Sequence, residues 1–376
     1  MMQVLGVATL LCPYVATLAE PMVYGASQEE QHTTTFFELA AERFTVRAGR
    51  RPTPADEAIV LKDMQFLRVP KAGSSTASVL ARRLGGCTPP GPCCNYFLDP
   101  RGSCPADGLM CPEVTGCTGH RVDKDKLLDP LVFSMSNLRD VVDRMVSGFF
   151  YGGGHAPQCS RKGVKDYERC FTAMITDTRY QNVVSKMFTG VHPYASQPRM
   201  CLKRAPTGGP CSADLESAVR GACNLNYIMI CESGGSSLLL LFETLPWLGP
   251  THDDFSRLDF SEDNPRGASF QAEARKNMGV EHDEGIKHIT PALRERASRA
   301  NAVDLAVHEF VSAKFCDRLA QVGLLEHPLV AEDLSSSSLM HQRCNNASWV
   351  ATTLEIFDPM VPENCRLFEP VDRPAN

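Results

Sequence analysis

Cysteines are frequent in this chain and gather in one part of it. There are 16 among 376 residues, and six of them fall between Cys87 and Cys117. A zinc site is one explanation, but the sequence has no Cys-x-x-Cys pair, and His120 is the only histidine close to this cluster. Disulfides formed in an oxidising compartment explain the pattern better. The cysteines therefore predict loops pinned by disulfides, whose pairing the sequence leaves open.

The N-terminus agrees with an oxidising compartment. Residues 4–19 are almost all apolar, which is short for a membrane-spanning helix of about 17–25 residues. We interpret residues 1–19 as a signal peptide cleaved near Ala19 or, because no Lys or Arg precedes Arg43, as a signal anchor whose true start is missing. Both alternatives predict the secretory pathway: the Golgi lumen, with membrane attachment through an anchor, or secretion.

Two smaller features follow from the same compartment. If Cys12 is removed with a leader, 15 cysteines remain and one must be unpaired; Cys231, in an apolar strand-like run, is the candidate for a buried free thiol. One glycosylation sequon is present, Asn346-Ala347-Ser348, and such a tripeptide also arises by chance.

Composition limits what the chain as a whole can do. Hydrophobic residues make up 43% and charged residues 22%, as in ordinary globular proteins, and the net charge is −6. A negative chain is not a general binder of polyanions, so we expect no nucleic-acid partner. An anion site must be local and built from a few basic residues.

Apolar runs with strand and helix periods alternate along the chain. We expect strands at 64–69, 131–135 and 227–231, which predicts an α/β fold with a central parallel sheet flanked by helices. We expect loops at 85–118, rich in Cys, and at 153–170. The helices are expected at 76–84, 141–150, 179–187, 236–245 and 290–324, the last with a buried stripe of Val303, Val307, Phe310 and Val311.

The first segment with chemical character joins the strand at 64–69 to the helix at 76–84. It is the turn formed by Lys71, Ala72, Gly73, Ser74, Ser75 and Thr76. Backbone N–H groups at a helix start, a lysine and small hydroxyl residues suit a phosphate or a phosphosulfate. The Walker pattern of nucleoside-triphosphate loops is absent. The alternative is an ordinary turn between a strand and a helix.

The second segment, 136–151, starts where the strand at 131–135 ends. Arg139 lies at the ligand side of an open parallel sheet, and Ser147 follows two helical turns later. An arginine and a serine in these places can hold a phosphate, the arginine with a bidentate fork. The alternative is that Arg139 and Arg144 only pair with Asp140 and Asp143.

Together the two segments resemble the 5′-phosphosulfate loop and the 3′-phosphate motif of Golgi carbohydrate sulfotransferases, the heparan sulfate 2-O- and 6-O-sulfotransferase-like enzymes being closest in type. The family's motifs read roughly Pro-Lys-Thr/Ala-Gly-Ser/Gly-Ser/Thr and Arg-Asp-Pro-x-x-Arg-x-x-Ser. Here Val141 stands in place of the proline. The resemblance covers about residues 62–325, with later segments that fit at 180–190, 227–241 and 301–305. It implies a P-loop-like sulfotransferase fold.

The resemblance also assigns domains. After residues 1–19 it implies a stem or linker at 20–58, a sulfotransferase domain at 59–330 with the Cys-rich insertion 85–118, and a C-terminal, disulfide-pinned extension at 331–376.

A third segment, Gly119-His120-Arg121, lies between the two motifs. In the 2-O-type enzymes a Gly-His at this place supplies the base, so the resemblance implies that His120 deprotonates the acceptor hydroxyl. A surface histidine in a loop is the alternative, and Glu113 and Asp123 are the fallback carboxylates.

The implied reaction transfers a sulfuryl group from 3′-phosphoadenosine 5′-phosphosulfate (PAPS) to a hydroxyl of a carbohydrate acceptor, glycosaminoglycan-like or another glycan. Lys71 stabilises the leaving group, residues 72–76 hold the 5′-phosphate, and Arg139 and Ser147 hold the 3′-phosphate. The scheme requires no metal. Three alternatives stay open: a disulfide-rich extracellular binding protein, a catalytically inactive sulfotransferase-like protein and a nucleotide-dependent kinase.

Overall fold

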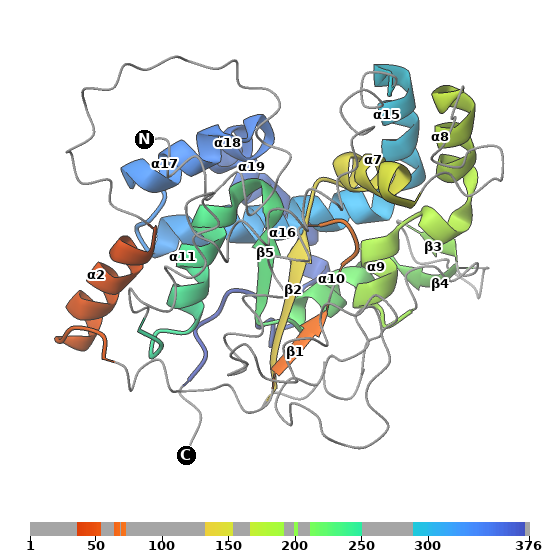
Figure 1. The fold of residues 1–376 in the computed structure, drawn as a ribbon. Helices are drawn as coiled ribbons and strands as arrows, with labels where there is room; N and C mark the ends of the chain where they lie inside the picture. Colours follow the sequence, from red (N-terminus) through yellow and green to blue (C-terminus); the bar gives the residue numbers. More distant parts are fainter. Residues whose placement is uncertain are drawn as a thin grey trace, which may run out of the picture.

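The computed structural model describes residues 36–53, 64–67, 69–72, 132–152, 166–191, 199–201, 211–249 and 289–372. These residues form an α/β fold, mostly helical, around a three-stranded parallel sheet of order β1-β2-β5 (Figure 1). The strands are β1 (Met64–Leu67), β2 (Phe133–Leu138) and β5 (Tyr227–Ile230). The expected α/β class is therefore confirmed at this level.

The central strand β2 begins and ends later than its apolar run predicts. Its residues are all buried although Ser134, Ser136 and Asn137 are polar. Neighbouring segments take up the side-chain hydrogen bonds of two of them: Ser136 Oγ donates to Leu67 O at 2.8 Å, and the Asn137 amide bonds the backbone of Val69. An apolar pattern alone places the strand at 131–135 and misses this polar half.

Helices precede and follow β5 along the chain and surround the sheet (Figure 1). The segment between β2 and β5 contains α7 (Val141–Gly152), α8 (Tyr167–Thr176), α9 (Val183–Phe188) and α10 (Leu215–Cys223), with the turn η3 (Thr178–Tyr180) and a separate pair of short parallel strands, β3 (Arg199–Cys201) and β4 (Cys211–Asp214). After β5 come η4 (Cys231–Ser233) and α11 (Gly234–Thr244).

Three sequence-based boundaries are corrected in this region and after it. Helix α8 begins inside the expected loop 153–170, because Asp166 caps it by accepting from Arg169 N at 2.9 Å. The helix expected at 179–187 is interrupted at Asn182, whose φ of 49° is left-handed. The helix expected at 290–324 is two helices, α15 (Pro291–Ala300) and α16 (Ala302–Gln321), which meet at Asn301.

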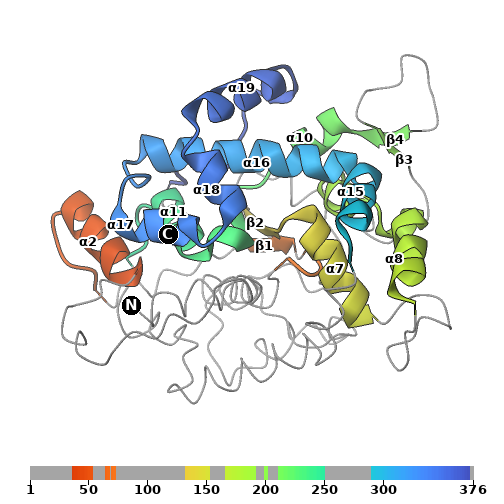
Figure 2. The same ribbon diagram turned by 90° about the horizontal axis from the view of Figure 1, so that it is seen from above.

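Helix α16 is the longest element and packs with its apolar stripe on the core. Its four stripe residues are buried, and the Thr290 side chain caps α15 by accepting from Leu293 N. The chain ends in α17 (Pro328–Ser335), α18 (Ser338–Cys344), α19 (Ala347–Phe357) and the turn η6 (Asp358–Met360). Figure 2 shows α19 on the side of α16 that faces away from the sheet.

Part of the predicted stem belongs to the folded body. Residues 36–48 form helix α2, which buries Phe36 and packs on α11. A Cβ at Gly235 would lie 2.3 Å from the Phe36 ring, so only glycine permits this approach. Arg43 Nε donates to Glu243 at 2.7 Å. The apolar spacing of Phe36, Leu39, Ala40 and Phe44 explains the helix, which the polar composition of the segment conceals.

Disulfides are present, and two of them tie the C-terminal residues to the rest of the fold. Cys223 of α10 bonds Cys365, and Cys316 of α16 bonds Cys344 of α18. The expectation of a free thiol at Cys231 is wrong, since this cysteine is also disulfide-bonded. Its apolar surroundings do not distinguish a thiol from a disulfide, because both are buried readily.

None of the helices described by the structure is long and apolar enough to cross a membrane. The predicted leader 1–19, the helix 76–84 and the Cys-rich insertion 85–118 lie outside the described residues.

Candidate functional site

The three parallel strands end at one edge of the sheet. The chain leaves β1 through residues 69–72, leaves β2 through Arg139 and Asp140, and leaves β5 through η4, which carries Glu232. Ligands of open parallel sheets bind outside the carboxyl ends of the strands. Lys71 and Arg139, two residues singled out in the sequence, therefore follow neighbouring strands at this edge.

Asn137 of β2 fixes the turn that contains Lys71. Its Oδ1 accepts from Val69 N at 3.0 Å, and its Nδ2 donates to Val69 O at 3.2 Å and to Ala72 O. One buried amide thus holds both ends of the turn. Lys71 has a φ of 62°, a left-handed conformation that costs a non-glycine residue about 1–2 kcal/mol and persists only when its surroundings impose it.

The same turn lies against helix α7. A Cβ at Gly148 would lie 4.0 Å from Lys71 Cγ, which places the lysine stem beside the residue that follows Ser147. Ser147 is half-buried. The fold thus brings Lys71 of the first predicted motif close to the helix that carries the second, although some 75 residues separate Lys71 from Ser147 along the chain.

Arg139 is buried at the same edge and is surrounded by acidic residues. Its exposed fraction is 4%. Burial lowers the pKa of Arg139, and the negative charges of Glu232, Asp143 and Asp140 oppose that shift. The guanidinium charge is thus balanced within the protein, mainly by Glu232.

Glu232 is held as a carboxylate. Its Oε1 accepts from Asp140 N at 2.5 Å, next to Arg139 in the chain. Burial by itself would raise the pKa of Glu232, but His308, the amide of Asp140 and Arg139 outweigh burial and keep this pKa below its ordinary value. Glu232 therefore links the ends of β2 and β5.

His308 of α16 continues this chain of contacts. Arg343 Nη1 lies 2.7 Å from His308 Nδ1 and 3.0 Å from Ser312 Oγ. A guanidinium only donates, so His308 Nδ1 must accept this hydrogen bond. His308 Nε2 lies 4.0 Å from Glu232 Oε2. Hydrogen bonds thus connect α18 with α16, and His308 approaches Glu232 at the sheet edge without a hydrogen bond between them.

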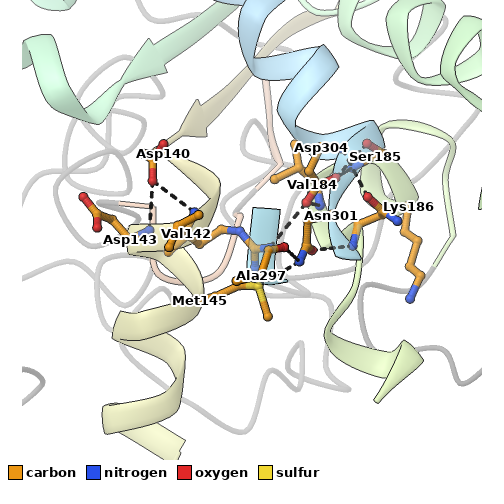
Figure 3. A network of polar contacts seen from close by, with 12 residues as sticks. Asp140, Val142, Asp143, Met145, Val184, Ser185, Lys186, Ala297, Asn301 and Asp304 are labelled. Carbon is orange, nitrogen blue, oxygen red and sulfur yellow. Dashed lines mark hydrogen bonds and ion pairs between the residues drawn. The ribbon is translucent and has the colours of Figure 1, made fainter. Parts of the chain in front are cut away.

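A second network holds α7 against α9 and α16 (Figure 3). Asp304 accepts from Val184 N at 3.1 Å and from Ser185 N at 2.8 Å, and it pairs with Arg144 at 3.3 Å. Asn301 Oδ1 accepts from Asn182 N at 2.8 Å. Since Asp304 takes up the first amides of α9, this network orients helices and leaves no ligand site there.

The ion pairs of Arg144 and Asp143 differ from the local pairing weighed for the second motif. Arg144 pairs with Asp304, and Asp143 pairs with Arg294 at 2.9 Å. Asp140 Oδ1 caps α7 by accepting from Val142 N and Asp143 N at 3.0 and 2.9 Å. The acidic residues of the motif are therefore used to start and to anchor α7.

No protein-family model, curated protein or solved structure matches this chain.

The remaining predicted site residues lie outside the described part of the chain. These are Gly73, Ser74, Ser75, Thr76 and His120, together with the fallback carboxylates Glu113 and Asp123. Among the residues that the structure describes, no group of three or more His, Cys, Asp or Glu side chains is placed to hold a metal ion.

Sequence reasoning missed four residues of this edge. Glu232 had a usable signal, because a charged residue directly after a buried strand lies at the ligand side of a parallel sheet. Asn137 gave no such signal, because the apolar run ends before it and only the structure extends β2 to Leu138. His308 was adjacent to the predicted stripe of α16, whereas Arg343 gave no signal, since its contact with α16 arises only from tertiary packing.

Proposed function

We propose that this protein is a PAPS-dependent sulfotransferase of the secretory pathway that acts on a hydroxyl of a carbohydrate, with a P-loop-like sulfotransferase fold. The observation that carries the proposal is the Lys71 turn: it follows the first strand, is fixed by Asn137 and lies close to Gly148 of α7, the residue after Ser147. Lys71, from the first segment that resembles a cofactor-binding motif, thus lies close to the helix that carries the second.

The proposed chemistry is an in-line displacement. The acceptor oxygen attacks sulfur, and the bond from sulfur to the 5′-phosphate oxygen breaks. His120 takes the hydroxyl proton, and the products are a sulfate ester and 3′-phosphoadenosine 5′-phosphate. Lys71 balances the charge that grows on the leaving phosphate.

In this proposal Arg139 and Ser147 recognise the 3′-phosphate, which distinguishes PAPS from ATP. Glu232 and His308 are positioning residues: Glu232 holds the backbone next to Arg139 and balances its charge until the phosphate arrives. Local basic residues and the loops would select the glycan, and an N-terminal anchor would keep the enzyme at the Golgi membrane.

A second candidate is a sulfotransferase-like binding protein without catalytic activity. The burial of Arg139 beside Glu232 favours it, because an arginine that is already neutralised binds a phosphate less readily. This second candidate therefore binds the 3′-phosphate only weakly, and only the first candidate transfers the sulfuryl group.

The deciding experiment is calorimetric binding of 3′-phosphoadenosine 5′-phosphate and of ATP to the folded, secreted protein. We expect binding of the bisphosphate that requires the 3′-phosphate, is lost in Arg139→Ala and is retained in Arg169→Ala, an exposed arginine of α8. Radiolabelled sulfate transfer from PAPS to a panel of glycans then separates enzyme from binding protein. A folded protein that binds neither nucleotide, or that binds only ATP, would refute the proposal.

A further inference from the structure

The chain's one sequon begins at Asn346, between α18 and α19, and continues into the first turn of α19. Asn346, Ala347 and Ser348 are all exposed. Asn346 is the N-cap of α19, and its Oδ1 accepts from Trp349 N at 2.9 Å. The tripeptide is thus displayed on the surface in a defined conformation.

We propose that Asn346 carries an N-linked glycan in the mature protein. In this modification a bond forms between Asn346 Nδ2 and the first sugar carbon of a lipid-pyrophosphate-linked oligosaccharide. The bond from that carbon to the pyrophosphate breaks, and the amide nitrogen loses one proton. The side-chain oxygen is not consumed.

The cap geometry is compatible with that chemistry. The cap uses Oδ1, whereas the glycan is attached to Nδ2, and none of the hydrogen bonds seen among the described residues engages Asn346 Nδ2. A glycosylated Asn346 therefore still accepts from Trp349 N. The position satisfies two demands at once, a stable helix start and an outward attachment point.

The neighbouring disulfides indicate the cellular compartment in which the chain folds. Cys344, two residues before Asn346, is bonded to Cys316, and Cys365 is bonded to Cys223. Disulfides of this kind persist in the lumen of the secretory pathway, where N-linked glycans are added. This observation is independent of the proposed sulfotransferase activity.

The surface of α19 fits a nearby glycan as well. The helix has a single charged residue, Glu355, and leaves Ile356 61% exposed. It lies on the side of α16 away from the sheet edge (Figure 2). A glycan here solubilises an apolar helix and leaves the candidate functional site open.

The test is to produce the full chain in cultured eukaryotic cells, once with its own N-terminus and once behind a host signal peptide. The disulfide-bonded protein from the lumen or medium is then treated with peptide N-glycosidase. We expect a mobility shift on treatment and conversion of Asn346 to aspartate in the peptide mass. Four variants distinguish the role of the sequon from that of the helix cap. Ser348→Ala and Asn346→Asp should lose the mobility shift, whereas Ser348→Thr and Asn345→Gln should keep it.

Asn346→Asp retains a side-chain acceptor for Trp349 N, so its loss of the glycan cannot be attributed to an unfolded helix. Lumenal, disulfide-bonded protein with unmodified Asn346 would overturn the proposal, as would a shift that survives Ser348→Ala. A chain that stays out of the lumen with both leaders would overturn it too, because Asn346 would then never meet the transferase.

Discussion

Lys71 and Arg139 occupy the same edge of the sheet in different electrostatic surroundings. Lys71 is half-buried on a turn held by Asn137, whereas Arg139 is enclosed and balanced by Glu232. In the proposed reaction the first acts on the leaving group and the second on recognition. Substitutions at the two positions should therefore affect different kinetic parameters.

Lys71→Ala should lower kcat by about 10²-fold or more and leave the affinity for 3′-phosphoadenosine 5′-phosphate almost unchanged, because a charge-stabilising donor acts mainly in the transition state. Steady-state rates and calorimetry on the same preparation check this. Lys314→Ala, on α16, is the matched control. An unchanged kcat in Lys71→Ala would remove the lysine from the mechanism.

Glu232→Gln keeps an acceptor for Asp140 N and removes the charge beside Arg139. Leaving a buried charge without its main partner costs about 3 kcal/mol, so the free energy of unfolding in urea should fall by that order. The control is Glu216→Gln, which breaks an exposed pair with Arg220 and should cost less than about 1 kcal/mol. Equal stability of the two variants would show that Glu232 does not balance Arg139.

Among the helices, α11 depends on a residue from another element. Its first amides find no side-chain cap from Ser233; instead Asp333 of α17 accepts from Ser236 N at 2.8 Å and from Gly235 N at 3.3 Å. The carboxyl group is fully enclosed. Burial raises the pKa of Asp333 to about 6, although the bonds from Ser236 and Gly235 oppose that rise.

This raised pKa predicts a pH dependence with a definite sign. Between about pH 4 and pH 6 the folded state holds a proton on Asp333 that the unfolded chain has lost, so stability falls as pH rises through this window. The free energy of unfolding of the wild type, compared with Asp333→Asn, should decrease by about 3 kcal/mol across it. Urea unfolding of both proteins at a series of pH values measures this difference. A difference that is constant with pH would contradict the shift.

For the molecule as a whole, the disulfides join segments that are remote in the chain. The bond between Cys223 and Cys365 spans 142 residues, and the bond between Cys316 and Cys344 spans 28. Arg366 N also donates to Cys223 O at 2.8 Å, and Phe368 N to Asn226 O at 2.9 Å. The C-terminal residues therefore close over α10 and the start of β5.

Removing these bonds should destabilise the fold according to loop length. Replacing Cys223 and Cys365 by alanine should lower the free energy of unfolding by about 5 kcal/mol, and replacing Cys316 and Cys344 by about 3.5 kcal/mol. Urea denaturation of each double variant tests whether the longer loop gives the larger loss of stability. Thiol counting confirms that the other disulfides remain intact. A larger loss from the shorter loop would show that packing, rather than chain entropy, sets the contribution.

The sequence by itself determined the elements whose signals are local. Alternating apolar runs predicted the α/β class, the strand at Tyr227, the helix that begins at Val141 and the buried stripe of α16, because each depends on neighbours within a few residues. The number of cysteines predicted disulfides, because composition alone indicates an oxidising compartment. The sequence missed the polar end of β2 and the breaks at Asn182 and Asn301, because buried polar residues form hydrogen bonds there. It also missed helix α2, whose apolar stripe lies in a segment of polar composition.

Only the tertiary structure decided which distant residues meet. The disulfide between Cys223 and Cys365 joins residues far apart in sequence. So do the approach of Lys71 to α7 and the hydrogen bond between Arg343 and His308. Their free energies depend on burial and on distances that no local pattern encodes. A charged residue looks alike in sequence whether water or a buried partner neutralises it, and only the folded chain separates the two cases.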